Sequence, residues 1–263
     1  MKCTPYYIIV LLCSHMAVAQ ILNIEKSVLD RDTTKKFIGN INGNLLLYNR
    51  SAAADEPVEF FGFDFRSSIA WFPGKHRLSS ISRIDYLKIN EDPFLNTGYQ
   101  HFRFDFRKDR KVHPEIFAQY QYDNFRGLDP RLLVGTGMRH RLYRDEHFTL
   151  IFSVGIMYES EKWTHPKTEE IIPIAFWKST NYLVFRIKIS EWADFNSIQY
   201  YQTAYDPGIE AFRHRYSTDV NLNTKLTARL QWTTSFILSF ENRPIVPIVR
   251  TIYRFSNGIT YKF

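Results

Sequence analysis

The sequence predicts an all-β protein: a single transmembrane, antiparallel, up-and-down β-barrel of about 12 strands, preceded by a cleaved signal peptide. Long segments alternate apolar residues with polar or small ones, which suits a wall between lipid and a wet interior. The expected connections between these segments alternate in length along the chain. The chain also ends on an aromatic residue, Phe263, in phase with Tyr261 and Ile259. These three observations together indicate the fold class.

Residues 1–19 have the pattern of a secretory signal peptide. Lys2 supplies a positive charge, residues 6–12 form a short apolar run, and residues 17–19 read small-x-small. The pattern predicts cleavage between Ala19 and Gln20. The alternative is an uncleaved anchor helix. Such a helix needs about 20 apolar residues to span hydrocarbon, and the run at residues 6–12 is too short. The sequence therefore predicts an exported protein.

Both cysteines precede the predicted cleavage point. Cys13 follows Leu12, whereas a lipoprotein signal needs a small residue before the acylated cysteine, so we set a lipid anchor aside. Cleavage removes Cys3 as well. The mature chain therefore offers no disulfide and no thiol chemistry.

The composition excludes two classes of protein. Cleavage removes Lys2 from the 34 basic residues and leaves 33 against 27 acidic ones, but the basic residues are dispersed and not gathered in a tract. Together with export, this argues against a nucleic-acid partner. After residue 19, no apolar run reaches the ~18 residues of a membrane-spanning helix, and the mean hydropathy is −0.31. A soluble β-sandwich would also alternate, so composition alone does not separate it from a barrel.

The barrel is expected over residues 37–263, after a polar periplasmic lead-in at residues 20–36. The first four predicted strands are Phe37–Tyr48, Val58–Trp71, Lys75–Lys88 and Tyr99–Arg107. The first is rich in Asn and Gly, so its facing stays open. The second and fourth set rows of phenylalanine, beginning at Phe61 and Phe102, against polar neighbours. A tight turn at residues 73–74, Pro-Gly, separates the second strand from the third.

The three central strands carry the clearest alternation. They are predicted at Pro114–Tyr122, Arg131–Tyr143 and Phe148–Glu159. In the last of them, the even-numbered residues from Phe148 to Tyr158 form an unbroken apolar row. Their neighbours, such as Ser153 and Gly155, are small or polar. A period of two places these two sets on opposite faces of a sheet.

Five further strands complete the prediction. They are Thr180–Ser190, Phe195–Ala204, Ala211–Asn221, Lys225–Glu241 and Val249–Phe263. Residues 160–179 form the longest predicted loop, and Pro244 and Pro247 require another loop before the last strand. Connections after odd-numbered strands are mostly longer than those after even-numbered ones. This asymmetry is typical of outer-membrane barrels, which have short periplasmic turns and long outer loops.

The end of the chain adds a signal for assembly. A final strand with Tyr261 and a terminal Phe263 resembles the signal by which outer-membrane proteins are handed to the barrel-insertion machinery. Together with the signal peptide, it predicts the Gram-negative outer membrane as the location. The expected partners are outer-membrane lipids and that machinery, and we expect a monomer.

The segment from Gln119 to Gly137, QYQYDNFRGLDPRLLVGTG, resembles the core of a Gram-negative protein family of unknown function. Members of that family are labelled salt-induced outer-membrane proteins. The resemblance is sharpest over residues 114–160 and extends over about residues 60–263. It implies an outer-membrane barrel and provides no catalytic residues to carry over.

The polar faces of the predicted strands carry charged residues that would point into the lumen of a barrel. These candidates are Asp64, Arg66, Arg83, Asp85, Arg103, Asp105, Arg107, Arg139, Arg141, Arg186, Lys188, Arg213, Arg215, Asp219, Arg229 and Arg254. Twelve of them are basic and four are acidic. They predict either a narrow pore for small anionic solutes or a paired internal network that fills a structural envelope protein.

An outer-membrane lipid hydrolase, of the phospholipase or lipid A deacylase type, is the rival hypothesis. Such enzymes use a Ser–His pair on the lipid-facing wall. Ser256-Asn257-Gly258 looks similar to their signature, but Arg254 stands where the histidine is needed. We therefore expect no catalytic residues. The histidines are scattered and Gly135-Thr136-Gly137 lacks the lysine of a phosphate loop, so no metal or cofactor is expected either.

Overall fold

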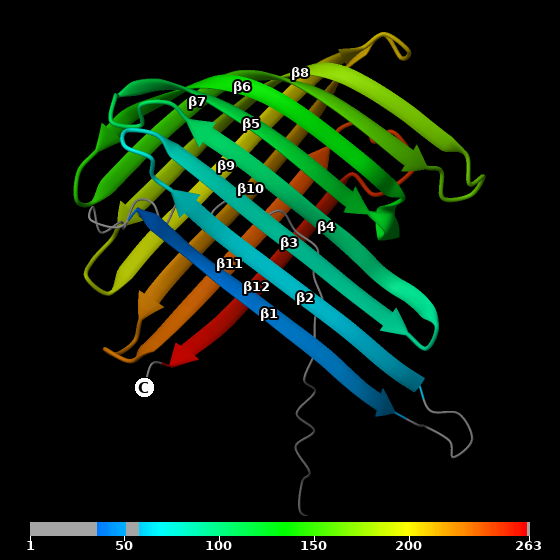
Figure 1. Cartoon of the computed structure of the whole chain (residues 1–263), viewed down its shortest axis with the longest axis horizontal. Coiled ribbons are helices and arrows are strands. Elements are labelled where there is room, and N and C mark those ends of the chain that lie inside the picture. Colours follow the sequence, from blue (N-terminus) through cyan, green and yellow to red (C-terminus); the bar gives the residue numbers. More distant parts are fainter. Residues whose placement is uncertain (1–35, 51–57, 262–263) are drawn as a thin grey trace, which may run out of the picture.

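The computed structural model describes residues 36–50 and 58–261. Twelve antiparallel strands follow one another around a single up-and-down sheet, each bonded to its neighbours in the chain (Figure 1). They are β1 (Phe37–Arg50), β2 (Val58–Trp71), β3 (Arg77–Ile89), β4 (Asp92–Asp105), β5 (Val112–Asp123), β6 (Leu128–Arg144), β7 (Phe148–Thr164), β8 (Ile171–Lys188), β9 (Ala193–Asp206), β10 (Ala211–Lys225), β11 (Leu230–Glu241) and β12 (Thr251–Tyr261). A short 3-10 helix, η1 (Asn124–Arg126), joins β5 to β6.

The prediction of an all-β, twelve-stranded, up-and-down fold is confirmed. The predicted signal peptide with its cleavage point Ala19/Gln20, most of the lead-in and the terminal Phe263 lie outside the described residues. Tyr261 is the last residue of β12.

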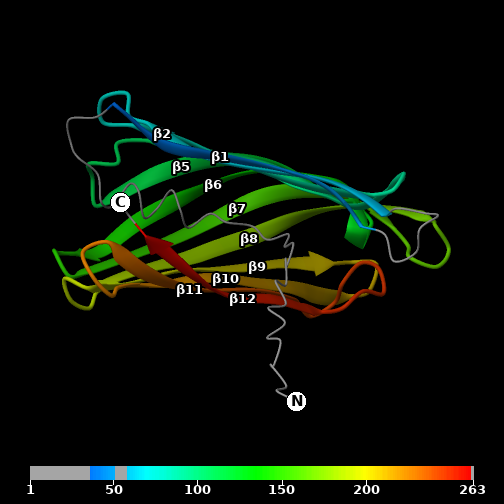
Figure 2. The same ribbon diagram turned by 90° about the horizontal axis from the view of Figure 1, so that it is seen from below.

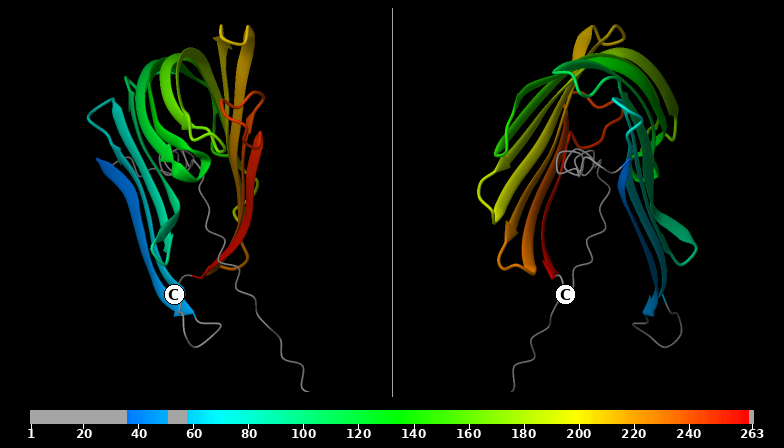
Figure 3. Two further views of the ribbon diagram at one scale, coloured as in Figure 1. Left: turned by 90° about the vertical axis from the view of Figure 1, so that its right-hand side faces the viewer. Right: turned by 60° about the vertical axis from the view of Figure 1, so that its left-hand side comes forward.

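The sheet curls so that its first strands face its last strands across an interior (Figures 2 and 3). Within residues 36–50 and 58–261, β1 pairs only with β2, and β12 pairs only with β11. These two strands therefore form the edges of the rolled sheet, and the line between them is called the β1–β12 seam below.

Alternation sorts the side chains into an outer and an inner face as predicted. On β7, Val154 and Ile156 are each 49% exposed on the outer face, whereas Ser153 and Glu159 are 1% exposed on the inner face. The predicted phenylalanine row of β2 is also exposed, at 41% for Phe61 and 37% for Phe63. Apolar rows therefore cover the outside of the sheet, and much of the polar sequence is buried inside.

The predicted loop at residues 160–179 is wrong, because β7 continues to Thr164 and β8 begins at Ile171. The polar residues taken for a loop extend the β7–β8 ladder, in which Pro173 pairs with Lys162. Pro173 is tolerated because β9 pairs with β8 only from Ser179 onward, so this part of β8 is an edge. The extension adds inward-facing residues that the sequence did not indicate.

The predicted alternation of loop lengths fails after β3 and β4. The connection after β3 consists of residues 90–91 alone, and that after β4, residues 106–111, is longer. Polar residues expected in loops extend the ladders instead, because the backbone hydrogen bonds of a ladder do not depend on apolar side chains. The predicted strand Lys225–Glu241 likewise begins only at Leu230, after a turn at residues 226–229.

Candidate functional site: the charged interior

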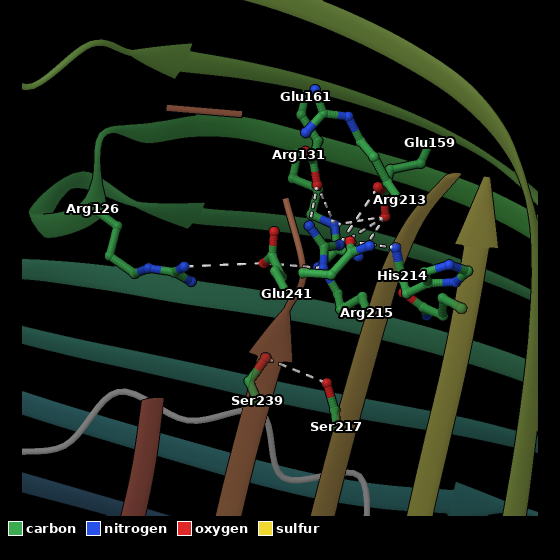
Figure 4. A network of polar contacts seen from close by, with 12 residues as sticks. Arg126, Arg131, Glu159, Glu161, Arg213, His214, Arg215, Ser217, Ser239 and Glu241 are labelled. Atoms are coloured by element: carbon green, nitrogen blue, oxygen red, sulfur yellow. Dashed lines mark hydrogen bonds and ion pairs between the residues drawn. The ribbon is translucent and has the colours of Figure 1, made fainter. Parts of the chain in front are cut away.

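Three glutamates lie together inside one end of the rolled sheet (Figure 4). Glu159 and Glu161 are two residues apart on β7, so both point inward, and each is 1% exposed. Arg131 on β6 donates to Glu159, with Nε 2.9 Å from Oε2, and its Nε also lies 3.2 Å from Oε1 of Glu161. Lys178 on β8 donates to the other oxygen of Glu159. The neighbours of β7 thus neutralise its carboxylates from both sides.

Arg215 reaches the same glutamates from β10. Its Nη2 lies 3.0 Å from Oε1 of Glu161, and its Nε lies 3.1 Å from Oε1 of the third glutamate, Glu241 on β11. Arg126 in η1 lies 4.0 Å from the same oxygen of Glu241. We call Arg126, Arg131, Glu159, Glu161, Lys178, Arg215 and Glu241 the rim cluster. It connects β6, β7 and β8 with β10 and β11 across the interior.

A second cluster lies farther along the interior and is centred on Glu115. Its Oε2 accepts a hydrogen bond of 2.8 Å from the Tyr182 hydroxyl, and its Oε1 accepts one of 2.7 Å from Ser153. Arg139 Nη1 donates to the same tyrosine oxygen at 2.9 Å. Arg103 Nη2 lies 3.2 Å from the hydroxyl of Tyr200 on β9. Charge-assisted bonds of this kind are stronger than neutral ones and suit a buried site.

Two further ion pairs line the inner wall nearer to β1. Arg66 Nη2 lies 2.5 Å from Asp64 Oδ2 on β2, and Arg83 donates to Asp85 on β3. A third pair joins β3 to β4, in which Arg77 donates to Asp105 at 2.6 Å. Each pair joins residues on one strand or on neighbouring strands, so these contacts neutralise charge locally.

A cavity of about 840 Å³ lies inside the rolled sheet. Charged residues from the clusters line part of it, among them Arg103, Glu115 and Arg215. Apolar side chains line the rest, including Tyr99, Phe117, Met157, Ile198 and Ile237. The interior is thus a mixed, partly apolar space and not a uniformly charged channel.

One end of the interior is covered by the connection between β11 and β12, residues 242–250, which we call the cap segment. Val246 of the cap segment is 2% exposed and packs with Leu128 and Trp163. Ile245 and Ile248 pack against the same group. Figure 3 shows the segment, in orange-red, turning inward at this end. The Trp163 indole also donates to Glu161 at 2.8 Å, which ties the cap segment's packing to the rim cluster.

The structure brings eleven of the sixteen predicted lumen residues to the inner wall: Asp64, Arg66, Arg83, Asp85, Arg103, Asp105, Arg139, Arg213, Arg215, Asp219 and Arg254. Arg186, near the end of β8, is half-buried and alternates in phase with the inward-facing residues of its strand. Lys188 is exposed at that end. Arg141 turns to the β4–β5 connection and donates to the carbonyl oxygens of residues 108–110.

Two of the predicted lumen residues are wrong. Arg107 is exposed in the β4–β5 connection with a φ of 51°, and Arg229 is exposed in the turn before β11. The prediction placed the end of the fourth strand too late for Arg107 and the start of the eleventh strand too early for Arg229.

Sequence reasoning missed about half of the interior charges. The missed residues are Arg77, Glu115, Asp123, Arg126, Arg131, Glu159, Glu161, Lys178, Asp206 and Glu241. Arg77 and Glu115 carried a usable signal, because Arg77 alternates in phase with the predicted inner residues Arg83 and Asp85, and Glu115 with the polar Gln119 of its own strand. Arg126, Glu161 and Lys178 lay in segments taken for loops. Six of these ten residues are acidic, and only seven of the twelve basic candidates reach the inner wall, so the interior is much closer to neutrality than twelve basic residues against four acidic ones.

Neither a metal site nor a membrane-spanning helix is found in the described part of the chain. None of its groups of His, Cys, Asp and Glu residues could hold a metal ion. Its helical residues form no helix long and apolar enough to cross a membrane.

Comparisons with known proteins agree with the resemblance noted in the sequence. No curated protein matches the chain. Among solved structures, the chain is similar to OmpT (in-vitro folded), an outer membrane protein of Vibrio cholerae, with 7% sequence identity, 86% of this chain and 98% of that chain covered, and a TM-score of 0.28. Residues 61–263 match a family described as "Protein of unknown function, DUF481". That description makes no mention of salt induction, so this label remains an expectation. The chain therefore belongs to the DUF481 family of proteins of unknown function.

Proposed function

We propose that the protein is a Gram-negative outer-membrane β-barrel with a structural role in the envelope, and that it does not conduct ions as an open pore. The exposed apolar rows of β2 and β7 support insertion in lipid, because such rows suit the outer face of a membrane barrel. We expect a monomer that contacts outer-membrane lipids and enters the membrane through the barrel-insertion machinery.

One observation carries the non-conducting role. Arg215 joins Glu159, Glu161 and Glu241 across the interior, at the end that the cap segment covers. An anion path needs cations that are free to exchange ligands, whereas the cations of the rim cluster are already paired with carboxylates. Because the charges of the rim cluster nearly cancel in pairs, we favour a structural role for the interior over an anion pore.

Planar-bilayer recording tests this proposal. The purified mature chain should insert and give no stepwise currents at moderate voltage in about 1 M salt. At this concentration, surface charges are largely screened, so they do not affect the recording. A general porin recorded in the same chamber is the positive control. Stepwise currents with a preference for anions would overturn the structural role and support the narrow pore.

A lipid hydrolase is a second candidate because of one cluster on the outer face. His214 on β10 lies beside two hydroxyls of β9: its Nδ1 is 2.8 Å from the Tyr201 oxygen and 3.1 Å from Oγ1 of Thr203. A hydroxyl and a base at this distance on a lipid-facing wall could cleave an ester. Purified protein incubated with phospholipid and with lipid A should release no fatty acid if the structural role is correct. Release that is lost in His214→Ala would instead support the hydrolase.

A further inference from the structure

The interior cavity has the composition of a ligand site for an amphiphile. Its volume of about 840 Å³ falls within the roughly 300–1,000 Å³ of small-molecule pockets. Such pockets are mostly apolar with a few placed polar groups. Here the apolar lining includes Tyr99, Phe117, Ile198 and Ile237, and charged residues border it on the side of β3, β10 and β12.

Two charged residues of that border lack an ion-pair partner. Among the described residues, no carboxylate lies within 4.0 Å of the Arg254 guanidinium, and its buried Nε has no hydrogen-bond partner. Asp219 is 5% exposed and receives a 3.0 Å hydrogen bond from the Asn221 amide, but no cation of the described chain lies within 4.0 Å of it. Buried charges are costly unless they are paired, so these two groups are suited to a ligand that pairs both.

The surrounding charges favour a ligand with no net charge. The neighbours Arg66 and Arg83 already contact Asp64 and Asp85. On the side of β3, β10 and β12, the charges that remain without an ion pair among the described residues are one cation, Arg254, and one anion, Asp219, both facing the same cavity. A ligand that carries only one sign of charge would pair with one of them and repel the other. A zwitterionic group would satisfy both.

The position of Arg254 also indicates how a ligand could enter. Arg254 is on β12, whose outer edge faces the β1–β12 seam, and no ladder closes this seam in the described residues. The outer residues beside it, Tyr253 and Phe255, are 70% and 58% exposed. If the sheet is embedded in the membrane as proposed above, an amphiphile could pass from lipid to the cavity between β1 and β12 without crossing the rim cluster.

We propose that the cavity binds a single-chain zwitterionic lipid, with its anionic group on Arg254, its ammonium group on Asp219 and its acyl chain among Tyr99, Phe117, Ile198 and Ile237. This inference rests on the proposed placement in the membrane. It goes beyond a purely structural role because it assigns a ligand class and two recognition residues.

Native mass spectrometry of the mature chain, released from detergent micelles, tests the proposal. The probe is a 16-carbon lysophosphatidylethanolamine, compared with palmitate, which lacks the cation, and hexadecylamine, which lacks the anion. One molecule of the lysolipid should bind per chain, and each single-charge probe should bind at least about tenfold more weakly, the effect of losing one charge-assisted hydrogen bond. Equal binding of the three probes, or no bound lysolipid, would overturn the proposal.

Variants separate this site from general adsorption. Arg254→Gln and Asp219→Asn should each weaken lysolipid binding about tenfold, whereas Lys188→Gln, which removes an exposed charge outside the cavity lining, should leave it unchanged. Ile237→Trp should block binding by filling the cavity. Undiminished binding in Arg254→Gln and Ile237→Trp would contradict the site.

Heat-modifiable migration on a gel, the usual sign of a folded barrel, checks that each variant folds. A chain that never inserts into lipid vesicles contradicts the proposed membrane placement. A chain that inserts and folds but binds no lysolipid contradicts the ligand site alone.

Discussion

Nη2 of Arg215 lies 3.0 Å from Oε1 of Glu161 and joins β10 to β7, two strands that are not neighbours in the sheet. The ladders of an up-and-down sheet connect only consecutive strands, so contacts of this kind are what hold opposite walls together. Both side chains are largely buried, at 11% and 1% exposed. The stability of the rolled sheet should therefore depend on this pair.

Arg215→Ala should destabilise the folded protein strongly, because it leaves the carboxylates of Glu161 and Glu241 with fewer cations inside the sheet. Breaking a buried ion pair typically costs about 3–5 kcal/mol. Urea unfolding in lipid vesicles, followed by tryptophan fluorescence, measures the change. Arg229→Ala is the matched control, because Arg229 is exposed in a turn and surface substitutions usually change stability by less than about 0.5 kcal/mol. Equal effects of the two variants would show that the rim cluster does not stabilise the fold.

Val246→Asp should weaken the cover that the cap segment places over the interior. The substitution puts a charge against Leu128 and Trp163, where Val246 is 2% exposed. We expect stepwise currents in planar bilayers where the unmodified chain gives none. Ile209→Asp, at a 42% exposed position of the β9–β10 connection, is the control and should stay silent. If Val246→Asp also gives no stepwise currents, the rim cluster alone closes this end.

Ile156→Arg should destabilise the protein in lipid. Ile156 is 49% exposed in the middle of the outer row of β7. An arginine on the lipid face near the bilayer midplane costs about 2–4 kcal/mol. The free energy of unfolding in vesicles reports this cost. The control, Thr227→Arg, changes an exposed turn residue and should have little effect. An equally small effect of Ile156→Arg would contradict the assignment of this face to lipid.

Asp145→Ala should weaken the β6–β7 turn at neutral pH and much less in acid. The Asp145 carboxylate accepts backbone hydrogen bonds from Phe148 at 2.6 Å and His147 at 2.7 Å, and one from the Tyr143 hydroxyl at 2.8 Å. These bonds, that from Phe148 first, hold the pKa of Asp145 below its ordinary value of 3.8. A lowered pKa means that the contribution is present above pH 3.8 and is lost as the pH falls through the folded-state pKa.

The measurement compares the unfolding of Asp145→Ala and unmodified chains at pH 7 and at pH values stepped down to roughly 2. Their difference in stability should shrink in acid. Glu146→Ala, at the exposed neighbouring position, serves as the control. A difference that stays the same at all pH values would show that the carboxylate does not act through its charge.

Gly135 illustrates what a sequence pattern predicts and what it leaves open. The alternation of β6 places Gly135 on the inner face, and the sequence shows only that a small residue is used there. In the structure, an ideal Cβ at Gly135 would lie 2.4 Å from the ring of Phe117, a residue of the neighbouring strand β5. It would also lie 2.8 Å from the backbone carbonyl oxygen of Ile156, which cannot move aside as a side chain can, so the position requires glycine.

The sequence by itself determined the twelve antiparallel strands and which of their faces is apolar, because both follow from local alternation with a period of two. It also indicated most of the inward arginines and aspartates. Only the tertiary structure decided which charges are paired, since Arg215, Glu161 and Glu241 come from strands far apart in the chain. Strand ends were likewise decided by the ladders, because a polar residue is equally acceptable in a loop and at the end of a strand. The near-neutral interior and the packing of the cap segment over one end could likewise be recognised only once the sheet was rolled.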